Sequence, residues 1–157
     1  MRLLVFSDSH GKSSAMEQVA WDHPEADALL HLGDCERDFE GVQILFPQKI
    51  IRMVRGNCDW FSQTPVVDML TVAGKRILLA HGHTFQVKIS LEDIMAEAKN
   101  RQADIVLFGH THVPLVDYKD GIYVLNPGSI SLPRAGAPTY GVVDITEAGI
   151  VTRVVIL

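Results

Sequence analysis

The sequence is poor in cysteine, with two in 157 residues, and it contains no long uncharged apolar run. Two thiols are too few to staple a small secreted fold, so we expect Cys35 and Cys58 to be reduced. The chain also shows no basic leader followed by an apolar segment, so we expect neither secretion nor a membrane span. Together, these absences predict a cytoplasmic protein.

The sequence also lacks a cluster of basic residues. Its 14 Lys and Arg against 19 Asp and Glu give a formal net charge of -5. Since binding to a long polyanion depends on such a cluster, we expect no stable nucleic-acid complex, and a nuclease is disfavoured. A small phosphorylated substrate is compatible with this charge, because bound metal cations would reverse the local field.

The chain does contain one pattern that occurs five times, an apolar run that is followed by polar residues and glycine. The run from Leu3 to Phe6 leads into Asp8 and His10. The later runs lead into Asp34, into Asn57 with Asp59, into His81 with His83, and into His110 with His112. Unbroken apolar runs are typical of buried parallel strands, whose carboxyl ends carry functional sites. We therefore expect these side chains to converge at one edge of one sheet.

The remaining pattern predicts one domain over residues 1–157. A capping box that begins at Ser14 predicts a helix ending near Pro24, and a second short helix is expected over 38–47. Ser90 and Asn100 are expected to cap a third helix. Hairpins are expected at residues 73–75, 120–121 and 147–149, so the chain is a mixed α/β protein with parallel pairing early and antiparallel pairing late.

The polar residues at the strand ends form a ligand set for divalent metals: Asp8, His10, Asp34, Asn57, His81, His110 and His112. Carboxylate, amide and imidazole together suit Mn, Fe or Zn better than Ca. The set exceeds what one ion needs and a carboxylate can bridge, so we expect two ions roughly 3.5 to 4 Å apart. Such a pair activates water and clamps a phosphoryl group, which predicts phosphoester hydrolysis.

Each ligand taken singly has a structural alternative. Asp8 is also typical of a turn, Asp34 of a helix N-cap, and Asn57 of a left-handed turn residue. His110 and His112 are spaced like two surface histidines on an extended segment. The metal site is favoured because one cause explains all five strand ends.

Six other residues are assigned to structural roles: His23, His31, Cys35, Trp21, Trp60 and Phe61. The two histidines lie at a helix end and inside a strand, and Cys35 is expected to be a small buried hydrophobe. The aromatic residues show no stacking pattern, so we expect them to pack in the core or in loops rather than to bind nucleobases.

The ordered motifs resemble those of the calcineurin-like metallophosphoesterases: Asp8-x-His10, Gly33-Asp34, Gly56-Asn57, His81-Gly82-His83 and Gly109-His110-x-His112. Gly-Asn-Cys-Asp at 56–59, Asn-Pro-Gly-Ser at 126–129 and the short length are similar to the small bacterial and archaeal phosphodiesterases of that family. The resemblance implies two mixed β-sheets packed as a sandwich and flanked by helices, in four layers α-β-β-α.

The resemblance also implies a role for each ligand. Asp8, His10 and His112 would hold one metal. Asn57, His81 and His110 would hold the second, and Asp34 would bridge the two. A bridging hydroxide would attack phosphorus, with Mn the expected ion and Zn, Fe, Ni or Mg as alternatives. The substrate implied is a small phosphodiester. The alternative is a protein-binding scaffold, since the small retromer subunit resembles this fold, but the presence of His81 and His110 favours an enzyme.

The candidate catalytic residues are Asn57, Cys58, Asp59 and His83. Many relatives have histidine at the position of Cys58, and a thiol with a pKa of about 8.5 is a poor replacement as an acid. We therefore expect aryl diesters to be cleaved faster than alkyl monoesters. Asp59 is expected to support its loop, and His83 to contact substrate or metal.

The candidate phosphate-binding cations are Arg37, Arg55 and Arg134. The apolar edge at 154–157 could pair with a second copy of the chain in a homo-oligomer.

Overall fold

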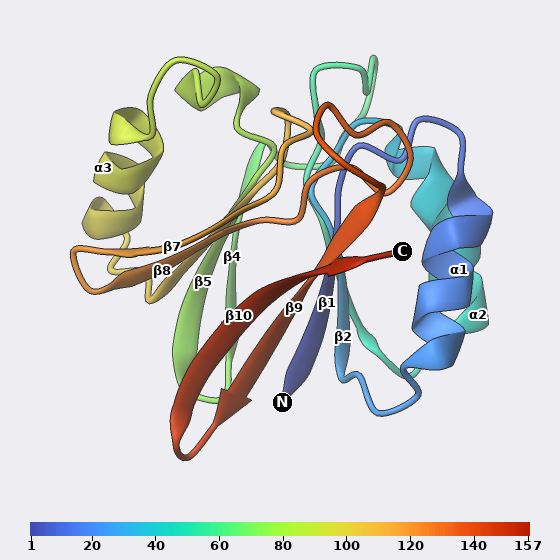
Figure 1. The fold of residues 1–157 in the computed structure, drawn as a ribbon, viewed down its shortest axis with the longest axis horizontal. Helices are drawn as coiled ribbons and strands as arrows, with labels where there is room; N and C mark the ends of the chain where they lie inside the picture. The colour runs from blue at the N-terminus through green and yellow to red at the C-terminus, as the bar shows by residue number, and fades with distance from the viewer.

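The computed structural model describes residues 1–157 and contains two five-stranded mixed sheets that face each other (Figure 1). The first sheet has the order β10-β9-β1-β2-β3 and the second the order β4-β5-β6-β8-β7. The first sheet consists of β1 (Arg2–Phe6), β2 (Ala28–His31), β3 (Ile50–Met53), β9 (Thr139–Thr146) and β10 (Gly149–Ile156). The second consists of β4 (Val67–Val72), β5 (Lys75–Ala80), β6 (Ile105–Phe108), β7 (Leu115–Lys119) and β8 (Ile122–Asn126).

Helices cover the outer face of each sheet (Figure 1). On the first sheet lie α1 (Ser13–Asp22), the 3-10 helix η1 (Glu36–Phe39) and α2 (Glu40–Leu45). On the second lie α3 (Glu92–Asn100) and the 3-10 helix η2 (His83–Phe85). The four-layer α-β-β-α class that the family resemblance implied is therefore confirmed.

The unbroken apolar runs are explained by burial on both faces of each inner strand. In β1, Leu3 and Val5 point into the core between the sheets, whereas Leu4 and Phe6 pack under α1 and α2. In β5, Ile77 faces the same central core while its neighbour Leu78 packs under α3. The apolar runs Leu3–Phe6 and Ile77–Ala80 thus bury every side chain, and the polar groups follow where each run ends.

The predicted helices are present, but their caps differ. The capping box at Ser14 is wrong, because α1 begins at Ser13 and has no side-chain cap. The preceding turn is organised instead by Asp38, whose carboxylate accepts the N–H of Gly11. Helix α3 begins after Leu91, with the Ser90 hydroxyl accepting only the N–H of Glu92, so the expected N-cap is displaced by one residue.

The predicted hairpins are confirmed. Ala73 and Gly74 join β4 to β5, and Asp120 and Gly121 join β7 to β8, with positive φ at all four residues. Two consecutive left-handed residues match the twist of antiparallel strands. Lys75, expected in the first loop, is the first residue of β5.

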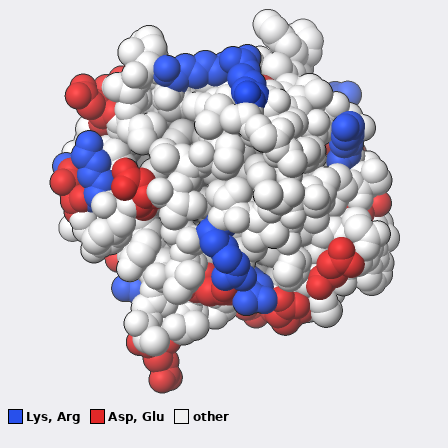
Figure 2. All heavy atoms as spheres, viewed as in Figure 1, with Lys and Arg blue, Asp and Glu red and all other residues white.

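The surface agrees with the expected absence of a basic groove on the face that Figure 2 shows. There, Lys and Arg side chains lie at separate places among acidic and neutral atoms. None of the helices is long and apolar enough to cross a membrane.

Candidate metal centre

The polar strand ends do meet, but the expectation of one edge of one sheet is wrong. Asp8 and Asp34 follow β1 and β2 of the first sheet, whereas His81 and His110 follow β5 and β6 of the second. The parallel strands β1, β2 and β3 belong to the first sheet, and the chain then enters the second sheet through the antiparallel hairpin of β4 and β5. Since His81 Nε2 lies 3.5 Å from Asp34 Oδ1, the two sheets bring their carboxyl ends to the same place.

The loops that carry these residues are strained. Asp8, His10, Asp34, His110 and His112 all have positive φ, between 43° and 67°. A side chain other than glycine adopts this region rarely, at a cost of order 1–3 kcal/mol each, and such residues cluster at functional sites. The left-handed residues turn the chain sharply where each strand ends, so that the side chains point back to one centre.

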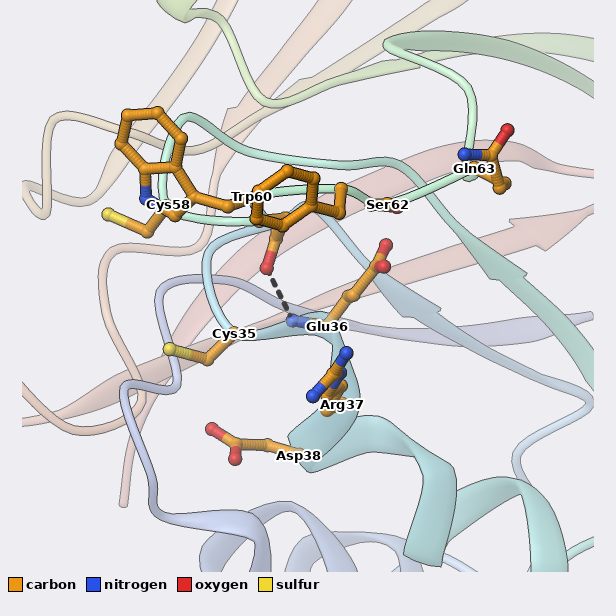
Figure 3. A pocket seen from close by; sticks show the side chains of 10 residues that line it. Cys35, Glu36, Arg37, Asp38, Cys58, Trp60, Ser62 and Gln63 are labelled. Carbon is orange, nitrogen blue, oxygen red and sulfur yellow. Dashed lines mark hydrogen bonds between the residues drawn. The ribbon is translucent and has the colours of Figure 1, made fainter.

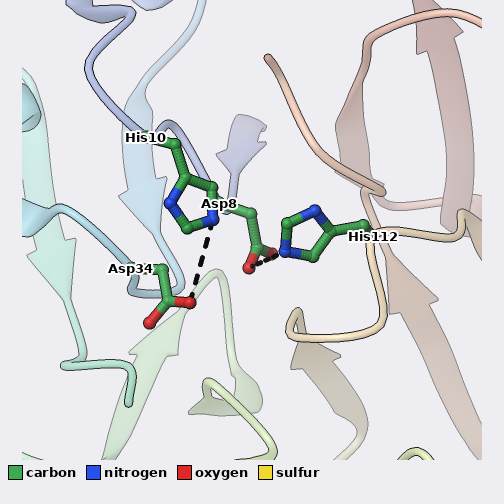
Figure 4. A group of neighbouring side chains, drawn as sticks. All are labelled: Asp8, His10, Asp34 and His112. Atoms are coloured by element: carbon green, nitrogen blue, oxygen red, sulfur yellow. Dashed lines mark ion pairs between the residues drawn. The ribbon is translucent and has the colours of Figure 1, made fainter. Parts of the chain in front are cut away.

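Four of the predicted ligands form a tight group (Figure 4). One ligand atom from each of Asp8, His10, Asp34 and His112 lies within 4.8 Å of all the others. His112 Nε2 is 3.0 Å from Asp8 Oδ1, and His10 Nε2 is 3.9 Å from Asp34 Oδ2. Although these atoms lie close together, neither Asp8 Oδ1 nor His10 Nε2 makes a hydrogen bond.

His81 extends this group on the side of the second sheet. Its Nε2 lies 3.5 Å from Asp34 and 3.9 Å from Asp8 Oδ1. The ring of His110 packs edge to face on that of His81 with centroids 5.0 Å apart, and the ring of His83 lies 5.4 Å from His81. Asp34 thus connects the first group to His81, against which the other two imidazoles pack.

Asn57 is the predicted ligand that the structure leaves outside this cluster. Its side chain is exposed, and its Nδ2 donates a hydrogen bond to the thiol of Cys58. The backbone of its loop is nevertheless held against Asp34, because the N–H of Cys58 donates to Asp34 Oδ1 over 2.8 Å. Asn57 is therefore next to the centre in the chain without touching the other ligands.

Hydrogen bonds from outside the cluster orient the histidines. His81 Nδ1–H donates to the carbonyl of Leu32, and His112 Nδ1–H donates to that of Leu132, both over 2.7 Å. Because each carbonyl can only accept, the proton is fixed on Nδ1 and the lone pair of Nε2 is turned to the centre. This is the usual orientation of histidines that bind metals.

Asp59 supports the loops rather than entering the cluster. Its two carboxylate oxygens accept the backbone N–H groups of Asp34, Glu36 and Gly56 at 2.6 to 2.9 Å. These three donors come from two separate loops, so Asp59 joins the turn after β2 to the turn after β3. Its removal would release the backbone that carries Asp34.

Sequence reasoning missed the residues that hold Asp8. The hydroxyls of Ser129 and Ser131 donate to the carbonyl of Asp8 at 2.8 and 3.2 Å, and the hydroxyl of Ser7 donates to its carboxylate. All four are buried. The Asn-Pro-Gly-Ser motif was the available signal, but the spacing alone did not connect it to a residue more than one hundred positions earlier.

The charges of the cluster favour ionised carboxylates. Burial opposes the charge of Asp8, but the close imidazole of His112 and the charge of His81 outweigh burial and lower the pKa of Asp8. The Asp8 carboxylate correspondingly raises the pKa of His112. Burial, aided by the charge of His81, lowers the pKa of His110 to about 4. The carboxylates are thus charged and His110 is neutral near pH 7, while the same carboxylates raise the pKa values of His81 and His112, whose Nε2 protons a cation would displace.

The buried atoms without partners test whether metals fit. They include Asp8 Oδ1, His10 Nε2, His81 Nε2 and His83 Nδ1. Buried polar atoms are almost always paired, so several orphans in one place require an explanation. Carboxylate oxygen and imidazole nitrogen are ligands of divalent transition metals, and the group is held in place by its own backbone. The residues present therefore fit divalent metal ions.

Several residues assigned to packing lie elsewhere than expected. Trp60 and Phe61 are 78% and 97% exposed, so the expectation that they pack is wrong; their loop contributes no side chains to any core cluster. Cys35 is only half-buried, with its thiol 3.9 Å from His10 Nδ1. His31 is fully buried against the ring of Phe39, as expected of a structural residue.

The three candidate arginines differ in their surroundings. Arg55 is used within its own loop, where Nη1 donates to the carbonyl of Ser62. Arg37 lies on η1 and lines a pocket beside the cluster. Arg134 is exposed, and its backbone N–H donates to the carbonyl of His112. Arg37 and Arg134 remain free to contact a substrate.

Residues 1–148 match the model of the calcineurin-like phosphoesterase superfamily domain. The chain is 35% identical to the probable metallophosphoesterase YsnB of Bacillus subtilis over 135 residues, which cover 85% of this chain and 78% of YsnB. It is 31% identical to the phosphodiesterase YfcE of Escherichia coli K12 over 171 aligned positions, which cover 92% of this chain and 88% of YfcE.

Solved structures show the same fold. A predicted phosphoesterase from Streptococcus pneumoniae has a TM-score of 0.86 at 32% identity, covering 99% of this chain and 88% of that one. A Vps29 variant from Entamoeba histolytica has a TM-score of 0.75 at 23% identity, covering 99% and 98%. The second likeness is below 25% identity and concerns the fold alone.

Proposed function

Because this chain belongs to the calcineurin-like phosphoesterase superfamily, we propose that it hydrolyses small phosphodiesters at a centre of two divalent metal ions. The observation that carries this proposal is the set of buried, unpartnered ligand atoms from Asp8, His10 and His81 around Asp34. No hydrogen-bonding role accounts for them, whereas ions between them would pair them all. The relative YfcE, itself called a phosphodiesterase, supports the choice of a diester.

We assign the first ion to Asp8, His10 and His112 and the second to His81, His110 and Asn57, with Asp34 shared. The ions, when bound, supply a hydroxide at neutral pH and neutralise charge on the phosphoryl oxygens. We propose Mn as the ion, since the mixed oxygen and nitrogen donors suit it. We propose the cytoplasm as the compartment. Asp59 holds the backbone of Asp34, and the carbonyls of Leu32 and Leu132 orient His81 and His112. Asn57 would reach the second ion by turning its side chain away from the Cys58 thiol.

The leaving group receives little help from Cys58. Burial and the nearby Asp34 carboxylate raise the pKa of this thiol to about 12, so it gives up its proton poorly near pH 7. In the reaction, a phosphorus–oxygen bond to water oxygen forms and the bond to the ester oxygen breaks. Aryl oxygens tolerate this without a proton, so aryl diesters should be the better substrates. His83 lies close enough to His81 and His110 to contact the phosphate.

The test uses metal-stripped protein refilled with Mn, Zn or Mg and assayed on bis(p-nitrophenyl) phosphate and on p-nitrophenyl phosphate. We expect metal-dependent turnover that favours the diester and is lost in Asp34→Asn and His81→Ala. Metal content measured on each variant separates lost binding from lost chemistry. A folded protein without turnover in any metal would refute the proposal and favour a protein-binding scaffold of the same fold.

A further inference from the structure

A pocket of about 600 Å³ opens beside the metal centre, between η1 and the loop of residues 57–63 (Figure 3). Two lining residues connect it to the centre. The thiol of Cys35 lies 3.9 Å from His10 Nδ1, and the N–H of Cys58 donates to Asp34. A phosphodiester at the metals would therefore have one ester arm within reach of the pocket, whose size suits a nucleoside.

The loop side of the pocket presents two adjacent aromatic residues to solvent. Trp60 is 78% exposed and Phe61 97% exposed, and Phe61 has a φ of 68°. The loop is nevertheless anchored, because Arg55 binds the carbonyl of Ser62 and Asp59 binds three backbone N–H groups. An exposed aromatic ring on an anchored loop can stack on a planar base.

The opposite wall supplies an acceptor. Glu36 Oε2 is buried without a hydrogen-bond partner, and it is the one such atom that does not belong to the metal centre. Figure 3 shows the Glu36 carboxylate extending from η1 toward the 57–63 loop. An unpaired carboxylate oxygen calls for N–H donors. The lining carries Glu36, Asp38 and Asp59 against the single cation Arg37, which disfavours a second phosphate and favours a neutral ligand.

We propose that this pocket binds the guanosine arm of a phosphodiester substrate. The base stacks on Trp60 and Phe61, and its adjacent N1–H and N2–H groups face the carboxylate of Glu36. Among the common bases, guanine alone presents two neighbouring donors on one edge, as a carboxylate requires. The inference rests on the proposed phosphodiesterase function, because it places the base of a substrate whose phosphate lies at the metals.

The first test compares three diesters that share p-nitrophenolate as leaving group and carry guanosine, uridine or methyl as the second arm. Hydrolysis breaks the bond to p-nitrophenolate and joins a water oxygen to phosphorus in each. We expect kcat/KM for the guanosine ester to exceed that for the uridine ester about tenfold, with Glu36→Gln removing the difference. Trp60→Ala should lower the guanosine to methyl ratio about tenfold. Trp21→Ala, an exposed tryptophan on α1, should leave both ratios unchanged.

A binding measurement separates this proposal from the catalytic one. In Trp21→Phe protein, Trp60 is the one remaining tryptophan, so its fluorescence reports on the pocket. Saturable quenching by guanosine, weakened by Glu36→Gln and weaker with uridine, supports the pocket even if no diester is cleaved. Diester hydrolysis with equal ratios for all three arms and no quenching overturns the pocket and leaves the phosphodiesterase standing.

Discussion

Gly56 tests most directly whether the metal centre depends on the contact between two loops. A Cβ at this position would lie 2.1 Å from Asp34 Oδ1 and 2.5 Å from the Asp34 nitrogen, whereas real Cβ contacts below 3.0 Å are essentially never seen. The φ of Gly56 is not positive, so Gly56→Ala brings a steric effect without a conformational one. The methyl group must displace both the carboxylate and the backbone nitrogen of Asp34.

The size of this effect follows from the geometry. The clash moves the shared carboxylate by roughly 1 Å, and a misplacement of that size can cost about 100-fold in rate. Overpacking adds a loss of about 1–3 kcal/mol of stability, which lowers the melting temperature by roughly 2 to 12 °C in a domain of this size. We therefore expect Gly56→Ala to fold, to bind Mn more weakly and to lose most of its diesterase activity.

The matched control is Gly41→Ala. Gly41 lies in α2, also without positive φ, and its Cβ would approach only the flexible end of Glu17. Alanine is favoured over glycine inside a helix by about 1 kcal/mol, so this variant should be as stable as the wild type or more so, with full activity. The assays are thermal melting, Mn titration by calorimetry and kcat/KM on an aryl diester. Wild-type Mn affinity and rate in Gly56→Ala would refute the reasoning.

Two further predictions concern titration and the leaving group. Burial lowers the pKa of His31 to about 4 in the folded protein from about 6.5 when unfolded. Between these values the unfolded chain takes up a proton that the folded chain does not. The free energy of unfolding therefore decreases as the pH is lowered, by up to about 1.4 kcal/mol per pH unit. Urea titrations at pH 7, 6 and 5 should show this slope reduced in His31→Gln; an unchanged slope would assign it to other groups. For Cys58→His, a stronger acid should narrow the ratio of aryl to alkyl diester rates by at least about tenfold. An unchanged ratio would show that this position supplies no proton.

The apolar pattern predicted strands that are covered on both faces, whereas the two-sheet, four-layer arrangement was implied only by the family resemblance. The apolar runs at 3–6 and 77–80 contain no polar alternation, and this is possible only for strands covered on each face. The sequence could not assign these runs to separate sheets, since strands of either sheet read alike. The spatial meeting of Asp34 with His81 depends on sheet packing, which local periodicity does not encode.

The exposure of the aromatic residues in the 57–63 loop could not be predicted from the sequence. Trp60 and Phe61 are apolar residues whose average behaviour is burial, and no periodicity in 57–63 indicated otherwise. Their exposure follows from the anchors of the loop, the carboxylate of Asp59 and the guanidinium of Arg55, which are contacts between side chain and backbone. Such contacts are determined by the tertiary structure, so exposure could be known only from the structure.

Strain and missing partners at the metal centre have one common explanation. Left-handed backbone at Asp8, His10 and Asp34 costs free energy, and so does every buried atom without a partner. The contact between His10 and Asp34 does not offset these costs, because His10 Nε2 and Asp34 Oδ2 remain 3.9 Å apart. Cations bound between these atoms would offset both the backbone strain and the missing hydrogen bonds. The apolar runs of the inner strands, which are buried on both faces, supply the stability that holds the ligands in this arrangement before the ions bind.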